Sequence, residues 1–199
     1  MRYAISLLSD AEWNKQTRIV FLNDDVKLDR GAAVRLLDCQ RTLPDAPVMV
    51  GMVLDNTGRI RYGVKRSNRR WNRLSLTTVI PQTKQFLQGD TFNCNFASCY
   101  LNQILMVDAF PTVFRQAGGD YDLGFKLADA GVTLLSYHEP VGEDSSDDRT
   151  RTGAPWSAKN LPPRMWAYMV LRYSHPLLWI PLMMSPYLKV LIGVRHGQR

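Results

Sequence analysis

Short apolar runs alternate with amphipathic stretches through the first two thirds of the chain. Residues 18–22 (RIVFL) form an apolar run of strand length, and 28–40 (LDRGAAVRLLDCQ) place apolar residues at helical spacing. A nearly continuous apolar run at 46–55 (APVMVGMVLD) is typical of a strand covered on both faces. This order of strand, helix and strand predicts an α/β fold with an open mixed sheet flanked by helices.

The alternation continues toward residue 139. Residues 59–66 (RIRYGVKR) alternate like one arm of a hairpin, and 92–110 (FNCNFASCYLNQILMVDAF) predict a strand that passes into a short helix. Two glycines then break the chain, Asp120 is the predicted N-cap of a second helix, and Gly131 is its predicted C-cap. A last strand is expected to end at His138 and Glu139.

The composition changes after residue 142, which predicts three parts: 1–142, a polar, proline-rich connector at 143–163, and a helical extension at 164–199. Prolines interrupt the extension, so it lacks the run of about 20 apolar residues that a spanning helix needs. We expect amphipathic helices at 164–196 that either lie peripherally on a membrane or pack against the sheet or a partner. In the membrane interpretation, the aromatic anchors at the membrane boundary are Trp166, Tyr168, Trp179 and Tyr187. The basic residues that face the head groups are Arg164, Arg172, Lys189 and Arg195.

The charge of the chain indicates what kind of partner it binds, and its cysteine content indicates the cellular compartment. The chain has 199 residues and a net charge of +7, with basic residues concentrated at 59–73. Such a segment fits an anionic membrane, a phosphorylated substrate or a solvated loop, and too few aromatic residues accompany it for nucleic-acid binding. Three cysteines without metal-site spacing and the lack of a signal peptide predict a cytoplasmic location, including the inner face of the cytoplasmic membrane.

Polar residues follow the predicted strands or open a predicted helix at three places: Asn23-Asp24-Asp25, Asp120 with Asp122, and His138. Carboxylates and an imidazole suit Mg²⁺ or Mn²⁺ that shares its coordination with phosphate oxygens. A carboxylate at a helix N-terminus is held ionised by the helix dipole, which suits a general base. Each set alone is also typical of an ordinary turn, cap or structural histidine.

Three segments resemble family 2 glycosyltransferases, especially their rhamnosyltransferase-like branch: IVFLNDDVKLDRGAAVRLL, FNCNFASCYLNQILMVDAF and GGDYDLGFKLADAG. The resemblance covers roughly residues 18–142. It implies a GT-A nucleotide-sugar-binding fold and a metal-dependent, inverting transfer from a nucleotide-sugar donor to a glycan or lipid-linked acceptor. The oligomeric state stays open.

The resemblance also implies roles for individual residues. Asn23, Asp24 and Asp25 stand at the positions of the family's D-x-D turn, which holds the donor diphosphate through Mg²⁺ or Mn²⁺, and Asp25 takes the metal-binding position. Asp120 stands at the position of the catalytic base and Asp122 at that of a second acidic residue. His138 occupies the place where some relatives carry an additional metal ligand.

Two departures from the family pattern matter. The residues YLNQ at 100–103 stand where the branch carries a basic pattern, and the acidic turn comes as early as residue 23. We therefore expect an N-terminally incomplete chain in which RYAISLL is at most the remnant of a helix. The alternative function is a non-catalytic remnant or binding module that holds a phosphorylated partner. A phosphohydrolase is disfavoured, because Asn23 cannot act as the nucleophilic aspartate of that class.

Overall fold

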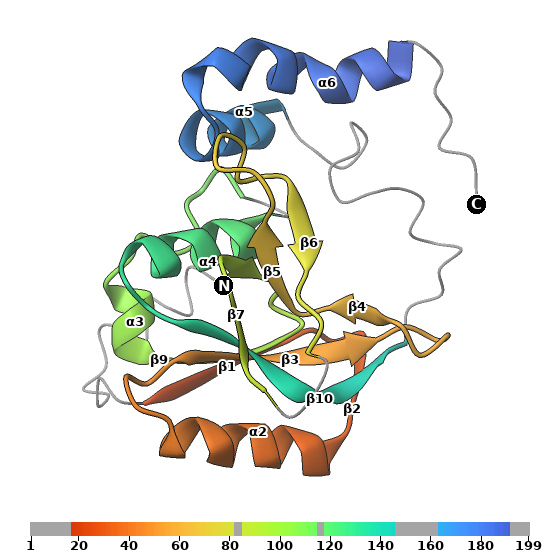
Figure 1. Cartoon of the computed structure of the whole chain (residues 1–199), viewed down its shortest axis with the longest axis vertical. Coiled ribbons are helices and arrows are strands. Elements are labelled where there is room, and N and C mark those ends of the chain that lie inside the picture. Colours follow the sequence, from red (N-terminus) through yellow and green to blue (C-terminus); the bar gives the residue numbers. More distant parts are fainter. Residues whose placement is uncertain (1–16, 82–84, 115–117, 146–162, 192–199) are drawn as a thin grey trace.

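The computed structural model describes residues 17–81, 85–114, 118–145 and 163–191. The predicted N-terminal remnant, the connector from 146 to 162 and the residues beyond 191, Arg195 among them, lie outside the described residues. So do the side chains at 187–191, which include two predicted membrane contacts. Within the described part the fold is mixed α/β, with a mixed sheet and flanking helices (Figure 1).

The central sheet runs in the order β1-β9-β3-β10-β2. The predicted strands at 18–22 and 46–55 are confirmed as β1 and β3. Both β1 and β3 pair antiparallel with β9, and β10 pairs parallel with β3. The carboxyl ends of β1, β3 and β10 therefore meet at one edge of the sheet. The strands are β1 (Arg18–Leu22), β2 (Val26–Leu28), β3 (Val48–Leu54), β9 (Phe96–Tyr100) and β10 (Leu134–Asp144), with β4 (Ile60–Tyr62) beside β3 and β7 (Leu87–Gly89) beside β10.

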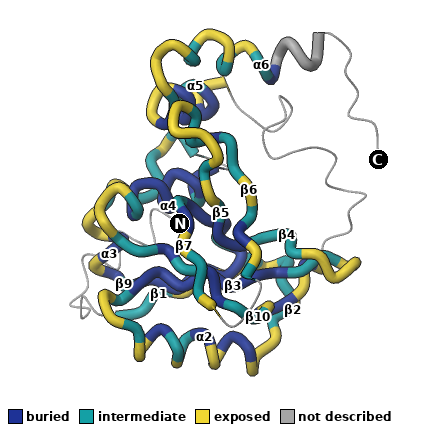
Figure 2. The backbone as a smooth tube through the Cα atoms, viewed as in Figure 1, coloured by how far each residue is buried: buried dark blue, intermediate teal, exposed yellow. Residues whose placement is uncertain are grey.

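Helix α2 (Arg30–Thr42) covers one face of the sheet, as the helical spacing at 28–40 predicts. Asp29 caps it by accepting a 3.0 Å hydrogen bond from the amide of Ala32. Its apolar face packs against Met49 and Tyr137 of the sheet, while its outer face is exposed (Figure 2). The buried side chain of Gln40 donates to the carbonyls of Pro47 and Ser98, so the one long polar group on the inner face is paired.

The prediction that the last strand ends at His138 and Glu139 was wrong, because β10 continues to Asp144. Its second half finds a partner that the sequence pattern does not reveal: β2 pairs antiparallel with it, Gly142 opposite Leu28. The register with β3 shifts on either side of Pro140, whose nitrogen cannot donate to the ladder. His138 thus lies within an irregular part of a strand rather than at its end.

The opposite face carries α3 (Leu101–Leu105), α4 (Gly119–Asp129) and a second sheet, β6 (Leu76–Thr78), β5 (Val64–Ser67) and β8 (Thr91–Phe92), in that order. The N-cap of α4 is Gly118, whose backbone is in the left-handed region at φ 81°. Asp120 is the second residue of the helix and lies in its first turn. The prediction that Asp120 is the cap is corrected accordingly. The glycine stop is found where expected, since Gly131 follows the C-cap with φ 84°.

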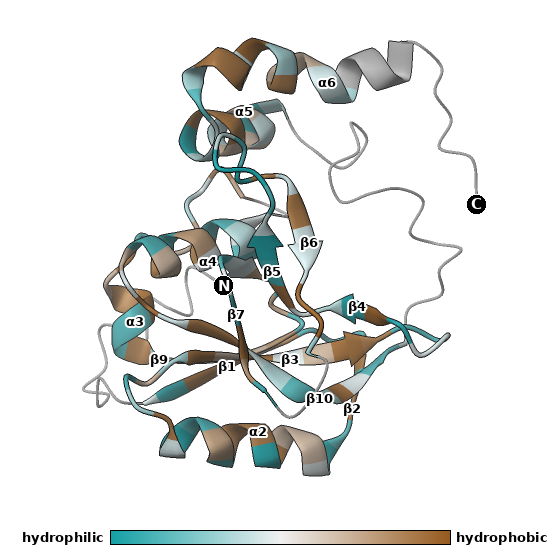
Figure 3. Ribbon diagram, viewed as in Figure 1, coloured by the Kyte–Doolittle hydropathy of each residue, from teal (hydrophilic) through white to brown (hydrophobic). Residues whose placement is uncertain are grey.

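The C-terminal elements are α5 (Pro163–Tyr173), the 3₁₀ turn η1 (Pro176–Leu178) and α6 (Trp179–Leu191). Met165 and Met169 of α5 share a buried cluster with Phe125 of α4. Trp166, an anchor only in the membrane interpretation, is buried, and its indole nitrogen donates to the carbonyl of Leu182 at 2.9 Å. Apolar residues recur along α6 (Figure 3), yet no helix in the described ranges is long and apolar enough to cross a membrane.

Candidate functional site

The acidic turn connects β1 to β2 at the edge where the carboxyl ends of β1, β3 and β10 meet. The amide of Asn23 donates to the carbonyl of Asn95 at 3.2 Å, and the carbonyl of Asp25 accepts bonds from the amide (2.8 Å) and hydroxyl (2.6 Å) of Ser145. Asp24 is exposed and Asp25 is half-buried. The backbone of the turn is therefore fastened on both sides.

Asp120 lies in the first turn of α4, where it collects hydrogen-bond donors. Its Oδ1 accepts from the amide of Tyr121 at 2.9 Å, and its Oδ2 accepts from the side-chain amide of Asn93 at 3.3 Å. Burial raises the pKa of Asp120, and the donors from Tyr121, Asn93 and the backbone of Cys94 only partly oppose this rise. A carboxylate whose pKa is raised is a stronger general base than an ordinary surface aspartate.

The loop Asn93-Cys94-Asn95, between β8 and β9, joins these two places. Its first residue bonds through its side chain to Asp120, and its third bonds through its carbonyl to Asn23. Both asparagines are buried, with 7% of each residue exposed. The structure thereby brings Asn23 and Asp120, which are distant in sequence, to opposite ends of one three-residue loop.

Sequence reasoning missed Asn93 and Asn95, although a signal was present. Two amide side chains stand at alternate positions among apolar residues in FNCNF, where a buried strand would carry none without a use for them. Within the described residues, the Nδ2 atom of Asn95 and the Oδ1 atom of Asn93 have no hydrogen-bond partner. Both atoms are buried groups able to bind a ligand hydroxyl.

Lys65 of β5 is a second residue whose place the sequence does not give. It pairs with Thr91 of β8, whose hydroxyl donates to the carbonyl of Tyr121 at the start of α4. The ammonium of Lys65 donates to Thr78 at 2.8 Å. Burial lowers the pKa of Lys65, and the negative charge of Asp120 acts in the opposite direction. A partly desolvated cation thus lies within electrostatic reach of the predicted base.

Asp122 points to a different environment from Asp120. Its carboxylate is fully buried, accepts a 2.5 Å bond from the hydroxyl of Tyr173 and lies 2.7 Å from the ammonium of Lys126. The contact with Tyr173 ties α4 to α5. This geometry gives Asp122 a structural function, and its role as the second acidic residue of the reaction stays a prediction.

His138 lies among aromatic side chains. Its ring centroid is 4.5 Å from that of Tyr137 and 5.6 Å from that of Phe86, and its Nε2 is 3.6 Å from a carboxylate oxygen of Glu139. None of these contacts belongs to the acidic turn. The role of His138 as a metal ligand also stays a prediction.

The acidic turn carries carboxylate oxygens, which are ligands that Mg²⁺ and Mn²⁺ prefer. Across the described ranges, no three His, Cys, Asp or Glu side chains gather as a ligand set. Such a set is not required for a cation that travels with a diphosphate, because Mg²⁺ commonly takes one or two carboxylates and completes its shell with phosphate oxygens and water. Asp24 and Asp25 are two carboxylates of this kind, next to each other in the chain, and their binding of a cation stays a prediction.

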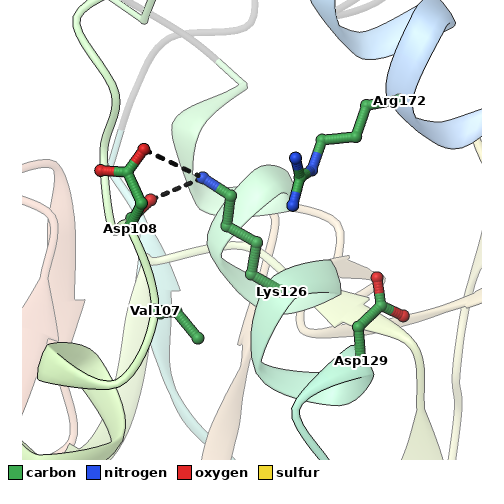
Figure 4. A pocket seen from close by; sticks show the side chains of 5 residues that line it. All are labelled: Val107, Asp108, Lys126, Asp129 and Arg172. Carbon is green, nitrogen blue, oxygen red and sulfur yellow. Dashed lines mark hydrogen bonds and ion pairs between the residues drawn. The ribbon is translucent and has the colours of Figure 1, made fainter.

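A hollow of about 190 Å³ opens elsewhere, beside the C-terminal half of α4 (Figure 4). The ammonium of Lys126 is already bonded there to the carbonyl of Asp108 at 2.5 Å. A ligand pocket usually encloses about 300 Å³ or more. We therefore do not assign this hollow to the donor. Its lining is Val107, Asp108, Lys126, Asp129 and Arg172.

Comparison of the chain with models of known protein families gave no match, and comparison with curated protein sequences gave none either.

Proposed function

We propose that this chain carries a GT-A-like glycosyltransferase site that transfers a sugar, with inversion, from a nucleotide-sugar donor to a glycan or lipid-linked acceptor. The observation that carries the proposal is the loop Asn93-Cys94-Asn95, which links the acidic turn at Asn23 to Asp120. A transferase of this kind needs a diphosphate-binding turn and a base beside one another. The resemblance of the three sequence segments to family 2 glycosyltransferases supports the same function.

Asp120 would accept the proton of the acceptor hydroxyl as that oxygen attacks the anomeric carbon and the bond to the diphosphate breaks. The amides of Asn93 and Tyr121 hold the carboxylate in one orientation for this transfer. Lys65, a nearby cation, would bind a phosphate oxygen as negative charge develops on the leaving group. Asp25, with Asp24 and Asn23 beside it, would hold Mg²⁺ or Mn²⁺, which would supply positive charge next to the donor diphosphate.

Calorimetry with uridine, thymidine and guanosine diphosphate sugars, with and without Mn²⁺, tests the proposal. Metal-dependent binding is expected, with loss of that binding in Asp25→Asn. Asp120→Asn should retain binding and lose transfer to acceptor. Asp38→Asn, on the exposed face of α2, is the matched control and should behave like the parent chain.

A folded chain that binds none of these sugars in the presence of Mn²⁺ would overturn the proposal in favour of the non-catalytic binding module. Turnover retained by Asp120→Asn would overturn the assignment of the base. Circular dichroism on every variant separates loss of function from loss of structure.

A further inference from the structure

The turn between β5 and β6 is fastened to the junction of α5 and α6. The rings of Trp71 and His175 stack with centroids 4.6 Å apart, and the amide of His175 donates to the carbonyl of Trp71 at 2.8 Å. Next to them, Asn72 pairs with Ser174 in an antiparallel bridge. Two segments far apart in sequence therefore form one surface, at the end of the molecule opposite α2 (Figure 1).

This surface exposes large apolar side chains. Leu177 and Ile180 are 73% and 79% exposed, and Trp71 and Met184 are 56% and 46% exposed. Single exposed apolar residues are ordinary, but three of these follow His175 closely in the chain and the fourth, Trp71, stacks on the ring of His175. Leu177, Ile180 and Met184 are spaced three and four residues apart along the turn and the helix that follows it, a spacing that places residues on one side of a helix.

The same surface is cationic, and the two segments that form it contain no acidic residue. Arg69 and Arg70 directly precede Trp71 and are exposed. Residues 59–89 and 163–191 contain neither Asp nor Glu. We define the basic-apolar tip as Arg69, Arg70, Trp71, Leu177, Ile180 and Met184.

We propose that the basic-apolar tip docks the protein peripherally on an anionic lipid bilayer. Apolar side chains on a protruding helix start can enter the boundary between head groups and acyl chains, and tryptophan favours that boundary. The two arginines would bind lipid phosphates, which are concentrated at an anionic surface. The contact differs from the one expected from the sequence, since Trp166 is buried and the β5–β6 turn supplies the exposed tryptophan.

Flotation of the full chain with vesicles tests this docking without any transferase readout. The chain is expected to float with vesicles of phosphatidylcholine and phosphatidylglycerol and not with pure phosphatidylcholine. Arg69→Gln with Arg70→Gln should weaken partitioning on the order of 25-fold, because each basic side chain at an anionic surface contributes about fivefold. Added salt should weaken binding of the parent chain through screening.

Leu177→Glu with Ile180→Glu removes apolar insertion without touching a buried contact, and should abolish flotation. The matched control carries Val34→Glu and Arg41→Gln on the exposed side of α2, and should float like the parent chain. The proposal is overturned if the parent chain stays unbound with both vesicle types, or if the control loses binding as fully as the tip variants. It is also overturned if light scattering shows a dimer that Leu177→Glu with Ile180→Glu dissolves while vesicle binding is absent, since the tip would then bind a second copy.

Discussion

Asn93 and Asp120 are joined by a 3.3 Å hydrogen bond from amide to carboxylate across 27 positions of the chain. The same amide donates to the hydroxyl of Tyr121 at 3.0 Å, so its orientation is fixed by two acceptors. Because donation to a carboxylate favours its ionised form, Asn93 lowers the pKa of Asp120 against the effect of burial. The proton affinity of the predicted base is thereby set by a neighbour on another element.

Replacement of Asn93 by Ala should raise the pKa of Asp120 further. Under the proposed function the base must be ionised, so the acidic limb of the transfer rate should move to higher pH while the rate at high pH is largely kept. The measurement is kcat/KM against pH, which reports the free enzyme. Asn102→Ala, on the exposed side of α3, is the control. An unchanged acidic limb in Asn93→Ala would contradict the coupling.

Asp120→Asn should make the fold more stable at neutral pH. Burial raises the folded-state pKa of Asp120 above the ordinary value of 3.8, so the folded chain binds the proton more tightly than the unfolded chain. The stability due to this group is therefore lost as pH rises from 3.8 through the folded-state pKa. Urea unfolding should show a gap between variant and parent that opens from acid to neutral pH. Equal stability of the parent chain and Asp120→Asn at every pH would show that ionisation of Asp120 does not lower the free energy of unfolding.

The sequence predicts the local elements well because their signals are local. Residues 18–22 and the helix within 28–40 are found as predicted, since apolar spacing acts within a few residues. The length of β10 was not predictable from its own residues, because its second half is held as a strand by β3 on one side and β2 on the other. Likewise, the contacts of Asn93 depend on how β8 and α4 pack, which no short stretch of sequence encodes.

The two aspartates of G-D-Y-D-L-G illustrate the same limit inside one motif. They stand two positions apart on a helix, so their side chains leave in nearly opposite directions. Asp120 faces the loop at Asn93, whereas Asp122 faces α5 and the hydroxyl of Tyr173. The motif could be read from the sequence, but the helix that covers Asp122 could not.

Tyr173→Phe should destabilise the chain by about 2 kcal/mol, because it removes a hydrogen bond to a buried carboxylate. The measurement is urea unfolding of the parent, Tyr173→Phe, Asp122→Asn and the double variant. The pair is expected to be non-additive, since each single change removes the charge-assisted form of the same contact. Asp122→Asn alone should cost more, about 3–5 kcal/mol, because it leaves Lys126 buried beside a neutral partner. Additive effects would show that the contact contributes nothing.

Gly124→Ala should destabilise the fold and displace the start of α4. A Cβ at this position would lie 2.4 Å from the hydroxyl oxygen of Thr91 and 2.8 Å from its Cα, so the backbones of α4 and β8 must separate. Overpacking of this kind costs about 1–3 kcal/mol. Gly31→Ala is the matched control, because its Cβ would meet only side-chain atoms on an exposed helix, Arg35 Nη1 at 3.3 Å and Asp29 Oδ1 at 3.4 Å. There the better helix propensity of alanine should stabilise the chain by about 0.5–1 kcal/mol. Urea unfolding distinguishes the two, and equal shifts of the same sign would refute the close approach of α4 to β8.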